Sequence, residues 1–551
     1  MRWTKELQRE LRGRKQGKVS SSARTLKKYS HDASMFELRP QLVVFPKNEH
    51  DISKVVNFVR QRKADLPFLS ITARSGGTDM SGGAINDSII LDVNKYMHHL
   101  GKIDGHHIST QPGVFYRKFE KRTLAHGLLM PSYPASREIC TVGGMAANNA
   151  GGEKTLRYGK TIDYIRRLKV ILSDGQSYTL KPLNQAELNQ KLQQRDFEGE
   201  VYHKVYKLIE KNYDQIKAAK PKVSKNSTGY NLWDVWDKET FDLSKLFVGS
   251  QGTLGLITEI EFGLVEAKPF SGMLIIYLKD LEPLGSLITT TLPTKPDSFE
   301  VFDDHSLILA IRFFFSFWKI LGIAATIKLA FQFIPDLWML RRGIPKLVAL
   351  AEFEGDSEDE VRAKVVDLEQ RLHQAELNVL TERAETAGKA KRYWLIRRES
   401  FNLLRHNVKD KHTAPFIDDL VVPPAKLPEF LPKLQKLLDA ADIVYTIAGH
   451  VGDGNFHIIP LMDLADPRER AKIPELMKQV NHLVLGFGGS LSGEHNDGLV
   501  RGPFLEEMYG PEMMNIFREA KKIFDPDDIF NPHKKVDAKW DYSLAHIRHG
   551  F

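Results

Sequence analysis

Apolar runs that adjoin glycine-rich clusters dominate the first half of the chain. Three such clusters precede residue 260, at residues 71–85, 141–152 and 247–255, and each lies next to a β-branched or apolar run. Short apolar runs of this type favour β-strands, whereas Gly and Ser between them favour loops. We therefore expect the first half to consist of strands joined by glycine-rich loops.

The second half shows a different pattern. Residues 271–280 (SGMLIIYLKD) and 346–354 (KLVALAEFE) have the continuous apolar character of buried strands, and a helix-like period follows each of them. Two shorter apolar runs, 443–447 and 458–461, flank a loop that contains glycines. This alternation predicts an α+β domain that ends near residue 488.

Length and composition narrow the classes of protein. A chain of 551 residues is too long for one hydrophobic core, so we expect two or three domains. Hydrophobic residues at 42% and charged residues at 27% exclude a mostly disordered chain. The single cysteine, Cys140, supports neither an internal disulfide nor an iron–sulfur cluster. An intracellular location is the default expectation.

The net charge of +8 has a local origin, because residues 1–28 hold ten Lys or Arg and only two Glu. This segment has no apolar run, which excludes a secretory signal, and its two Glu argue against a mitochondrial transit peptide. A solvated tail and a surface that meets anionic lipid both remain open, and we favour the tail. Aromatic residues do not alternate with the basic ones, so we do not expect nucleic-acid binding.

The most hydrophobic stretch, 307–340, lies in a predicted apolar helical insert at 306–343. Arg312, Lys319 and Lys328 interrupt it, so no charge-free window reaches the roughly 18 residues of a membrane-spanning helix. The pattern favours a helix that lies in the lipid interface, which would place the protein peripherally on the inner face of the cytoplasmic membrane. A helix pair buried inside the protein or at a dimer contact is the alternative.

The first glycine cluster, ITARSGGTDMSGGAI at 71–85, combines glycines with Ser and Thr. Such a loop lets several backbone N–H groups point at one anion, as a bound pyrophosphate requires, although it is more often an ordinary turn. The clusters at 141–152 and 247–255 repeat the same chemistry, which favours a dinucleotide with two phosphates. A Gly-x-Gly-x-x-Gly turn is not evident, so NAD is not the first choice.

A second group of reactive side chains occurs at 449–457, Gly-His-Val-Gly-Asp-Gly-Asn-Phe-His. Its glycines permit a sharp reversal that can bring His450 and His457 to one side. Downstream, Glu494 and His495 offer a carboxylate and a third imidazole. Two imidazoles and a carboxylate commonly bind zinc or manganese and keep one position open, although two His near glycines are more often structural.

These motifs, with Pro131 and Arg157-Tyr158-Gly159, together resemble the vanillyl-alcohol oxidase and p-cresol methylhydroxylase superfamily of FAD-linked oxidases and dehydrogenases. The nearest resemblance is to its branch of D-lactate dehydrogenases and glycolate oxidase D subunits. It implies FAD, a two-subdomain FAD-binding domain and a ferredoxin-like α+β substrate (cap) domain. The implied parts are a basic N-terminal segment, the FAD-binding domain, the cap domain and a C-terminal segment that packs on the FAD domain, at 1–37, 38–267, 268–488 and 489–551.

The resemblance also implies which residues contact FAD. They lie in the glycine clusters or beside them and are Arg74, Ser75, Gly76, Gly77, Thr78, Ser81, Gly82, Pro131, Thr141, Gly143, Gly144, Asn148, Ala150, Gly151, Gly252 and Ile257. In relatives that attach FAD covalently, a His often stands at the position of Thr78. Because Thr78 cannot form that bond, we expect non-covalent FAD.

By the same resemblance, His450, His457 and Glu494 are the expected ligands of a divalent metal, zinc or manganese. His495 is the expected catalytic base. The implied reaction is oxidation of a D-2-hydroxy acid to the 2-keto acid. Because the chain has no iron–sulfur module, its electrons are expected to pass to a separate acceptor, a quinone or an electron-transfer protein.

The substrate contacts that the resemblance implies are Arg397 and Asn455. Relatives that oxidise D-2-hydroxyglutarate carry a Lys two residues before the Asp that matches Asp419, and this chain has Ile417 there. We therefore favour D-lactate, with D-2-hydroxyglutarate as the alternative. A non-redox flavoenzyme of the ether-lipid synthase type and an electron-relay protein that binds FAD without turnover are further alternatives.

Overall fold

The computed structural model describes residues 2–11, 17–304, 306, 308, 344–384, 389–397 and 411–550, and the two larger sheets of its first half have four and five strands. The four-stranded sheet has the order β1-β2-β4-β3, with bounds Lys18–Ser20, Leu42–Phe45, Ile89–Asp92 and Ile71–Arg74. The five-stranded antiparallel sheet has the order β5-β6-β10-β8-β9, with bounds Leu100–Asp104, His107–Thr110, Leu256–Gly263, Ile165–Ile171 and Ser177–Leu180. All residues of β2 and β4 are buried, as expected for parallel strands that are covered on both faces.

Helices surround these two sheets. The longer ones are α3, α4, α8 and α9, with bounds Glu49–Arg62, Tyr116–Leu124, Gln185–Gln193 and Phe197–Lys211. One predicted loop differs, because the glycine cluster at 141–152 contains helix α5 (Val142–Asn148). This helix buries Met145 and Ala146 and ends at Asn149, which has a left-handed φ of 51°. Asn tolerates that conformation and so stops the helix, which apolar packing had stabilised despite its glycines.

An eight-stranded sheet forms the second half. Its order is β15-β12-β14-β13-β18-β19-β16, with β17 beside β19, and the bounds in that order are Val379–Ala384, Phe270–Leu278, Leu347–Gly355, Ser298–Asp303, Val444–His450, Asn455–Met462, His412–Thr413 and Leu420–Val421. The predicted strands at 271–280 and 346–354 are β12 and β14, which confirms the α+β character of this half.

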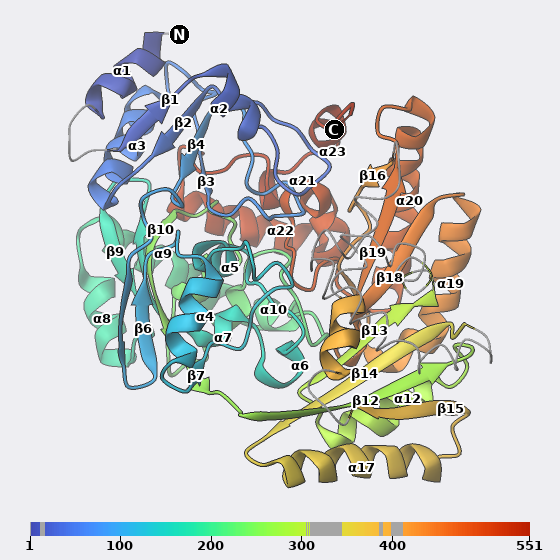
Figure 1. The fold of residues 1–551 in the computed structure, drawn as a ribbon. Helices are drawn as coiled ribbons and strands as arrows, with labels where there is room; N and C mark the ends of the chain where they lie inside the picture. The colour runs from blue at the N-terminus through green and yellow to red at the C-terminus, as the bar shows by residue number, and fades with distance from the viewer. Residues whose placement is uncertain are drawn as a thin grey trace.

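The two faces of this sheet differ. Helices cover the apolar face, and they are α12, α17, α19 and α20, with bounds Leu284–Thr291, Glu358–Gln374, Leu427–Ala440 and Pro467–Gly486 (Figure 1). Because side chains alternate along a strand, Glu300 of β13 points away from Phe299 and Val301, which belong to the helix-covered core. The opposite face carries a second apolar cluster, which includes Met273, Ile275 and Phe302, and beside it the buried acidic side chains Glu300 and Glu352.

The C-terminal segment returns to the first half of the chain. Figure 1 shows α21 (Gly498–Arg501) and α22 (Leu505–Phe524), in red, between the two halves. Farther along, Phe530 pairs with Ile71 of β3, and the Asn531 side chain bonds to Thr72 and to two backbone carbonyl groups. The last segment thus packs on β3 and on the loops that contain Gly83 and Gln251.

The solvated-tail interpretation of the N-terminus is wrong for its first described residues. Helix α1 (Arg2–Glu10) packs on α3 and buries Trp3 and Leu7 in the same core as β2 and β4. Its basic side chains lie on the outer side, so charge had concealed an apolar stripe.

The predicted insert at 306–343 lies outside the described residues, apart from Ser306 and Ile308. Of the helices in the described part of the chain, none combines the length and apolar character that crossing a bilayer requires.

A Leu7→Ala variant should lower the free energy of unfolding by about 2–5 kcal/mol, because Leu7 is fully buried. Arg9→Ala, on the exposed side of the same helix, is the control and should change it by less than about 0.5 kcal/mol. Denaturant unfolding of both variants measures the difference. Equal stability of the two would show that α1 does not pack in solution.

Candidate active site

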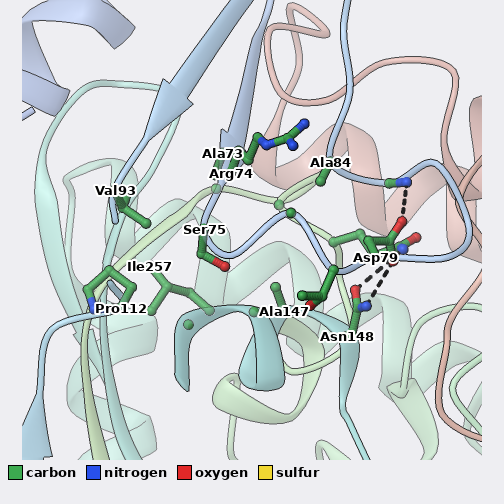
Figure 2. A pocket seen from close by; sticks show the side chains of 18 residues that line it. Ala73, Arg74, Ser75, Asp79, Ala84, Val93, Pro112, Ala147, Asn148 and Ile257 are labelled. Atoms are coloured by element: carbon green, nitrogen blue, oxygen red, sulfur yellow. Dashed lines mark hydrogen bonds between the residues drawn. The ribbon is translucent and has the colours of Figure 1, made fainter. Parts of the chain in front are cut away.

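A pocket lies where the three glycine clusters meet (Figure 2). It encloses about 760 Å³ with its open mouth included. The end of β3, helix α5 and the turn before β10 form its walls. The residues that line it are Ala73, Arg74, Ser75, Gly77, Thr78, Asp79, Gly83, Ala84, Val93, Pro112, Gly143, Gly144, Ala147, Asn148, Gln251, Gly252, Gly255 and Ile257.

Most of the predicted FAD contacts line this pocket, namely Arg74, Ser75, Gly77, Thr78, Gly143, Gly144, Asn148, Gly252 and Ile257. The others, which do not line it, are Gly76, Ser81, Gly82, Pro131, Thr141, Ala150 and Gly151. Three of these support the pocket walls. Gly76 lies against the backbone of Ile139, Gly82 packs on Phe36, and the Ser81 hydroxyl bonds to Asp79.

The pocket contains polar atoms that suit an anionic dinucleotide. Nη1 of Arg74 and Oγ1 of Thr141 are buried and have no hydrogen-bond partner in the described residues, and Arg74 lines the pocket. Buried donors of this kind normally have an acceptor. Gly77 and Gly252 have φ values of 69°, which gives the backbone a path that L side chains rarely follow. These features fit FAD, whose phosphates need donors at close range.

Sequence reasoning missed Asp79, whose carboxylate accepts from the Gly83 backbone N–H at 2.6 Å and from Asn148 Nδ2 at 2.9 Å (Figure 2). It also missed Gln251. An acidic residue is unexpected in a loop that binds phosphate, and only the hydrogen bonds reveal that Asp79 shapes the loop.

The hairpin β18–β19 brings His450 and His457 together, as the glycine spacing predicts. His450 pairs with Asn455 across the two strands, so His457, two residues farther on, shares its face. The two rings have centroids 5.2 Å apart. The turn requires Gly454, whose φ is 68° and whose added Cβ would lie 1.8 Å from the Val422 carbonyl oxygen.

Three imidazoles surround one oxygen of Glu494. The Nε2 atoms of His450, His457 and His495 lie 3.4, 3.4 and 3.8 Å from Glu494 Oε1. Four donors at about 2.0–2.1 Å from a tetrahedral zinc lie about 3.3 Å from one another. The three imidazoles and Glu494, hereafter the imidazole cluster, therefore have the chemistry and spacing that a divalent cation requires.

Carboxylates hold the other nitrogen of each ring. Nδ1 of His450 lies 2.5 Å from Glu300, Nδ1 of His457 lies 3.0 Å from Asp418 Oδ1, and Nδ1 of His495 lies 2.7 Å from Asp418 Oδ2. Carboxylates that accept from Nδ1 orient the ring and leave Nε2 with its lone pair, as metal ligation needs. Sequence reasoning assigned no role to Glu300 or Asp418.

Asp419 organises the backbone of the cluster. Its side chain accepts from Ser492 Oγ at 2.5 Å, from the backbone N–H groups of Glu494 and His495 at 3.0 and 2.8 Å, and from Asn455 Nδ2 at 3.0 Å. Asp419 is fully buried and has a left-handed φ of 67°. Ligand atoms of Asp419, His457, Glu494 and His495 all lie within 4.8 Å of one another, and this group does not include His450. Four donors already occupy Asp419, and His450 as a metal ligand remains a prediction.

The two predicted substrate contacts lie at the cluster. The Asn455 amide donates to Asp419 and to the Leu420 carbonyl oxygen and accepts from Lys225. Arg397 pairs with Glu300, which also holds His450, at 3.2 Å. Their roles toward a substrate remain predictions. Ile417 is buried in the apolar core, so no cation occupies its position.

A segment of the first half that the sequence did not single out also reaches the cluster. Lys225 is fully buried and lies 3.3 Å from Glu494 Oε2, opposite the imidazoles, and 3.5 Å from Asp453. Next to it, the Ser227 N–H donates to the Ser492 carbonyl oxygen at 3.0 Å. A lysine alone in a polar loop carries no sequence signal for such a contact.

These charges shift the pKa values of the cluster. Burial alone would raise the pKa of Glu494, but Lys225 and His450 lower it well below its usual range. Burial alone would lower the pKa of His457, but Asp418 and Glu494 raise it to about 10. Burial likewise opposes the rise in the pKa of His495, which Asp418 and Asp419 cause. Burial alone would raise the pKa of Asp418, but His495 and His457 lower it well below its usual range. Asp418 and Glu494 therefore stay ionised, and Asp418 keeps Nδ1 of His457 and His495 as donors.

The pocket and the cluster are neighbours. Asn496 Nδ2 donates to the backbone oxygens of Asn148 and Gly249 at 3.2 and 2.8 Å, and Asn148 lines the pocket. An added Cβ on Gly151 would lie 3.0 Å from Glu494 Oε2. A redox cofactor in the pocket could thus extend toward a molecule held at the cluster.

Two family models match the chain, a FAD binding domain at residues 40–181 and the C-terminal domain of FAD linked oxidases at residues 325–535. Together the two models cover more than half of the chain, which therefore carries both the FAD binding domain and the C-terminal domain of FAD linked oxidases. Over 98% of its length the fold matches 4-ethylphenol oxidase from Gulosibacter chungangensis and p-cresol methylhydroxylase, each with a TM-score of 0.68, at 16% and 14% identity and over 98% and 97% of those chains.

Three relatives indicate the range of activities in the family. The chain is 28% identical to a D-2-hydroxyglutarate dehydrogenase of Pseudomonas putida, in a match that covers 94% of this chain and 50% of that protein. It is 27% identical to a D-lactate dehydrogenase of Archaeoglobus fulgidus, over 90% and 91%. It is 24% identical to glycolate oxidase subunit GlcD of Escherichia coli K12, over 94% and 88%. The chain thus spans about half the length of the Pseudomonas relative.

An Asp419→Asn variant should lower the free energy of unfolding by about 2–4 kcal/mol, because an amide cannot accept all of these buried donors. Asn tolerates the left-handed backbone, so only the lost acceptor matters. Asp442→Asn is the control, since Asp442 is exposed and has a φ of 48°. Denaturant unfolding compares the two, and similar values would contradict the central role of Asp419.

Proposed function

We propose that the chain is a FAD- and metal-dependent dehydrogenase that oxidises a D-2-hydroxy acid, with D-lactate favoured, to the 2-keto acid. The observation that carries the proposal is the set of three imidazole Nε2 atoms around Glu494 Oε1, next to the pocket that suits FAD. The family and the names of its relatives support the same reaction class.

His450, His457 and Glu494 would hold zinc or manganese. When bound, such a cation lowers the pKa of the hydroxyl of a chelating hydroxy acid. His495 would then accept the hydroxyl proton at Nε2, because Asp418 holds the proton on Nδ1. FAD, when bound, would supply the two-electron acceptor for the C2 hydrogen. One hydride, which carries both electrons, leaves C2 and one proton leaves the hydroxyl oxygen, so the product is the 2-keto acid.

Arg397 and Asn455 are proposed to orient the substrate carboxylate. Arg397 lies with its Nη2 near Glu300, so it reaches the same side of the sheet as His450. An Arg in this place can present two parallel N–H groups to a carboxylate. Electrons would leave through a separate acceptor, for which a quinone at a membrane surface is our expectation.

The second candidate substrate is D-2-hydroxyglutarate, which the name of the Pseudomonas relative favours. The buried Ile417 argues for the smaller acid, because an apolar side chain cannot pair with a second carboxylate. The non-redox and electron-relay alternatives have no use for an oriented base beside the cluster.

Anaerobic mixing with a panel of D- and L-2-hydroxy acids tests the reaction. We expect D-lactate to bleach the flavin absorbance, with a slower response to D-2-hydroxyglutarate and none to the L-acids, and we expect chelation of the metal to abolish bleaching. His495→Ala should slow bleaching about 10²–10⁴-fold and keep the metal. His450→Ala should lose the metal as well.

The control for both variants is His482→Ala, since the His482 side chain is 85% exposed. Bleaching at the wild-type rate in His495→Ala would remove His495 from the mechanism. Absence of bleaching by every acid in the wild type would leave the electron-relay or non-redox reading instead.

FAD should be removable. Thr78 lines the pocket and cannot form a histidyl bond, so heat or acid denaturation should release all yellow colour into the supernatant. Absorbance of the supernatant and of the washed protein measures this. Flavin that stays with the polypeptide would refute non-covalent binding.

A further inference from the structure

Asp418 contacts two imidazoles, and the proposed reaction uses only one of these contacts, the one with His495. Its carboxylate is fully buried, and each of its two oxygens accepts from a different imidazole. Oδ1 faces Nδ1 of His457, an expected metal ligand, and Oδ2 faces Nδ1 of His495, the expected base. The two rings stack, with centroids 5.0 Å apart and an interplanar angle of 25°.

We propose that Asp418 is a positioning residue that sets the tautomer of His457 and His495 together, and so couples metal ligation to proton transfer. The inference rests on the proposed function. One shared carboxylate thus has two different tasks. Asp418 precedes β17 and His495 lies in the loop after α20, so the two residues are 77 positions apart.

The physical argument concerns where each ring carries its proton. An ionised carboxylate can only accept, so both rings must place a proton on Nδ1, and each ring in its neutral form then has its lone pair on Nε2. The lone pair of His457 Nε2 then points at Glu494 Oε1, where a cation would bind, and that of His495 Nε2 is available for a substrate proton. Without the carboxylate, neither choice is enforced.

Asn at this position would break the symmetry. Its carbonyl oxygen can accept from one ring, but its N–H₂ group must face the other, which then has to move its proton to Nε2. If that ring is His457, a metal ligand is lost. If it is His495, the base is lost. A bound cation requires the lone pair on Nε2 of His457. At saturating metal the Asn N–H₂ group should therefore face His495, which then loses the lone pair on its own Nε2.

Glu300 provides a matched comparison. Its carboxylate is also buried and also has two partners, the His450 imidazole and the Arg397 guanidinium. In the described residues it makes no ion pair with His495. A substitution of Glu300 should therefore weaken metal binding and substrate binding without altering the base. The difference between the two carboxylates isolates the shared role of Asp418 from a general effect on stability.

The experiment uses the full FAD-loaded chain as wild type, Asp418→Asn and Glu300→Gln. Zinc and manganese affinities are measured by competition with a chelator, and flavin bleaching is measured at saturating metal and saturating D-2-hydroxy acid. Both variants should bind metal about 10–100-fold more weakly. At saturation Asp418→Asn should stay about 10²–10⁴-fold slower than the wild type, and Glu300→Gln, which leaves His495 intact, should bleach at least about tenfold faster than Asp418→Asn.

Asp418→Ala distinguishes an enforced change of tautomer from the simple loss of a hydrogen bond. It also replaces Asp418→Asn in the experiment if that variant does not fold. Ala removes both acceptors but forces neither ring to move its proton, so it should bleach faster than Asp418→Asn and more slowly than Glu300→Gln at saturating metal. Thermal unfolding and FAD content confirm that each variant is folded.

The inference is overturned if Asp418→Asn reaches the wild-type rate once metal is saturating, or if Asp418→Asn and Glu300→Gln lose metal affinity and rate in parallel. Failure of the proposed function looks different. In that case the wild type itself binds no metal or shows no bleaching by any hydroxy acid.

Discussion

The active-site region depends on the burial of one carboxylate, that of Asp419. Four donors from two chain segments converge on it: Asn455 from the β18–β19 hairpin, and Ser492, Glu494 and His495 from the loop after α20. Its left-handed backbone allows the side chain and its own carbonyl oxygen to face the same loop. Ionic acceptors make the strongest hydrogen bonds of this type, and the low-dielectric surroundings increase their strength. Hydrogen bonds within the protein thus orient the candidate ligands without a bound cation.

Around this centre, buried charges are balanced across domain boundaries. Lys225 comes from the first half of the chain, Glu494 from the loop after α20, and Glu300 from β13 of the eight-stranded sheet. A buried charge without a partner costs several kcal/mol, so each of these residues stabilises the folded state only when the others are in place. The consequence is mutual dependence between the FAD-binding half and the imidazole cluster. A flavin and a hydroxy acid need exactly this close approach of two sites that are distant in sequence.

The sequence was informative where chemistry is local. The strands at 271–280 and 346–354, most of the pocket-lining glycines, and the pair His450 and His457 all depend on short-range patterns, and the structure has them as expected. It was uninformative for Asp79, Glu300 and Asp418, because acidic residues are common and only their partners in space distinguish them. The basic residues of the N-terminus led to the wrong prediction of a solvated tail, because an apolar stripe of the same helix packs on the core.

By itself the sequence determined the positions of the glycine-rich loops from residue type and spacing, and the family resemblance of its motifs gave the class of fold and the identity of the candidate ligands. Only the tertiary structure decided which nitrogen of each imidazole is available. That property is set by Asp418 and Glu300, which are far from the histidines along the chain and reach them through sheet pairing and loop closure. The physical reason is that a hydrogen bond acts over about 3 Å, whatever the separation in sequence.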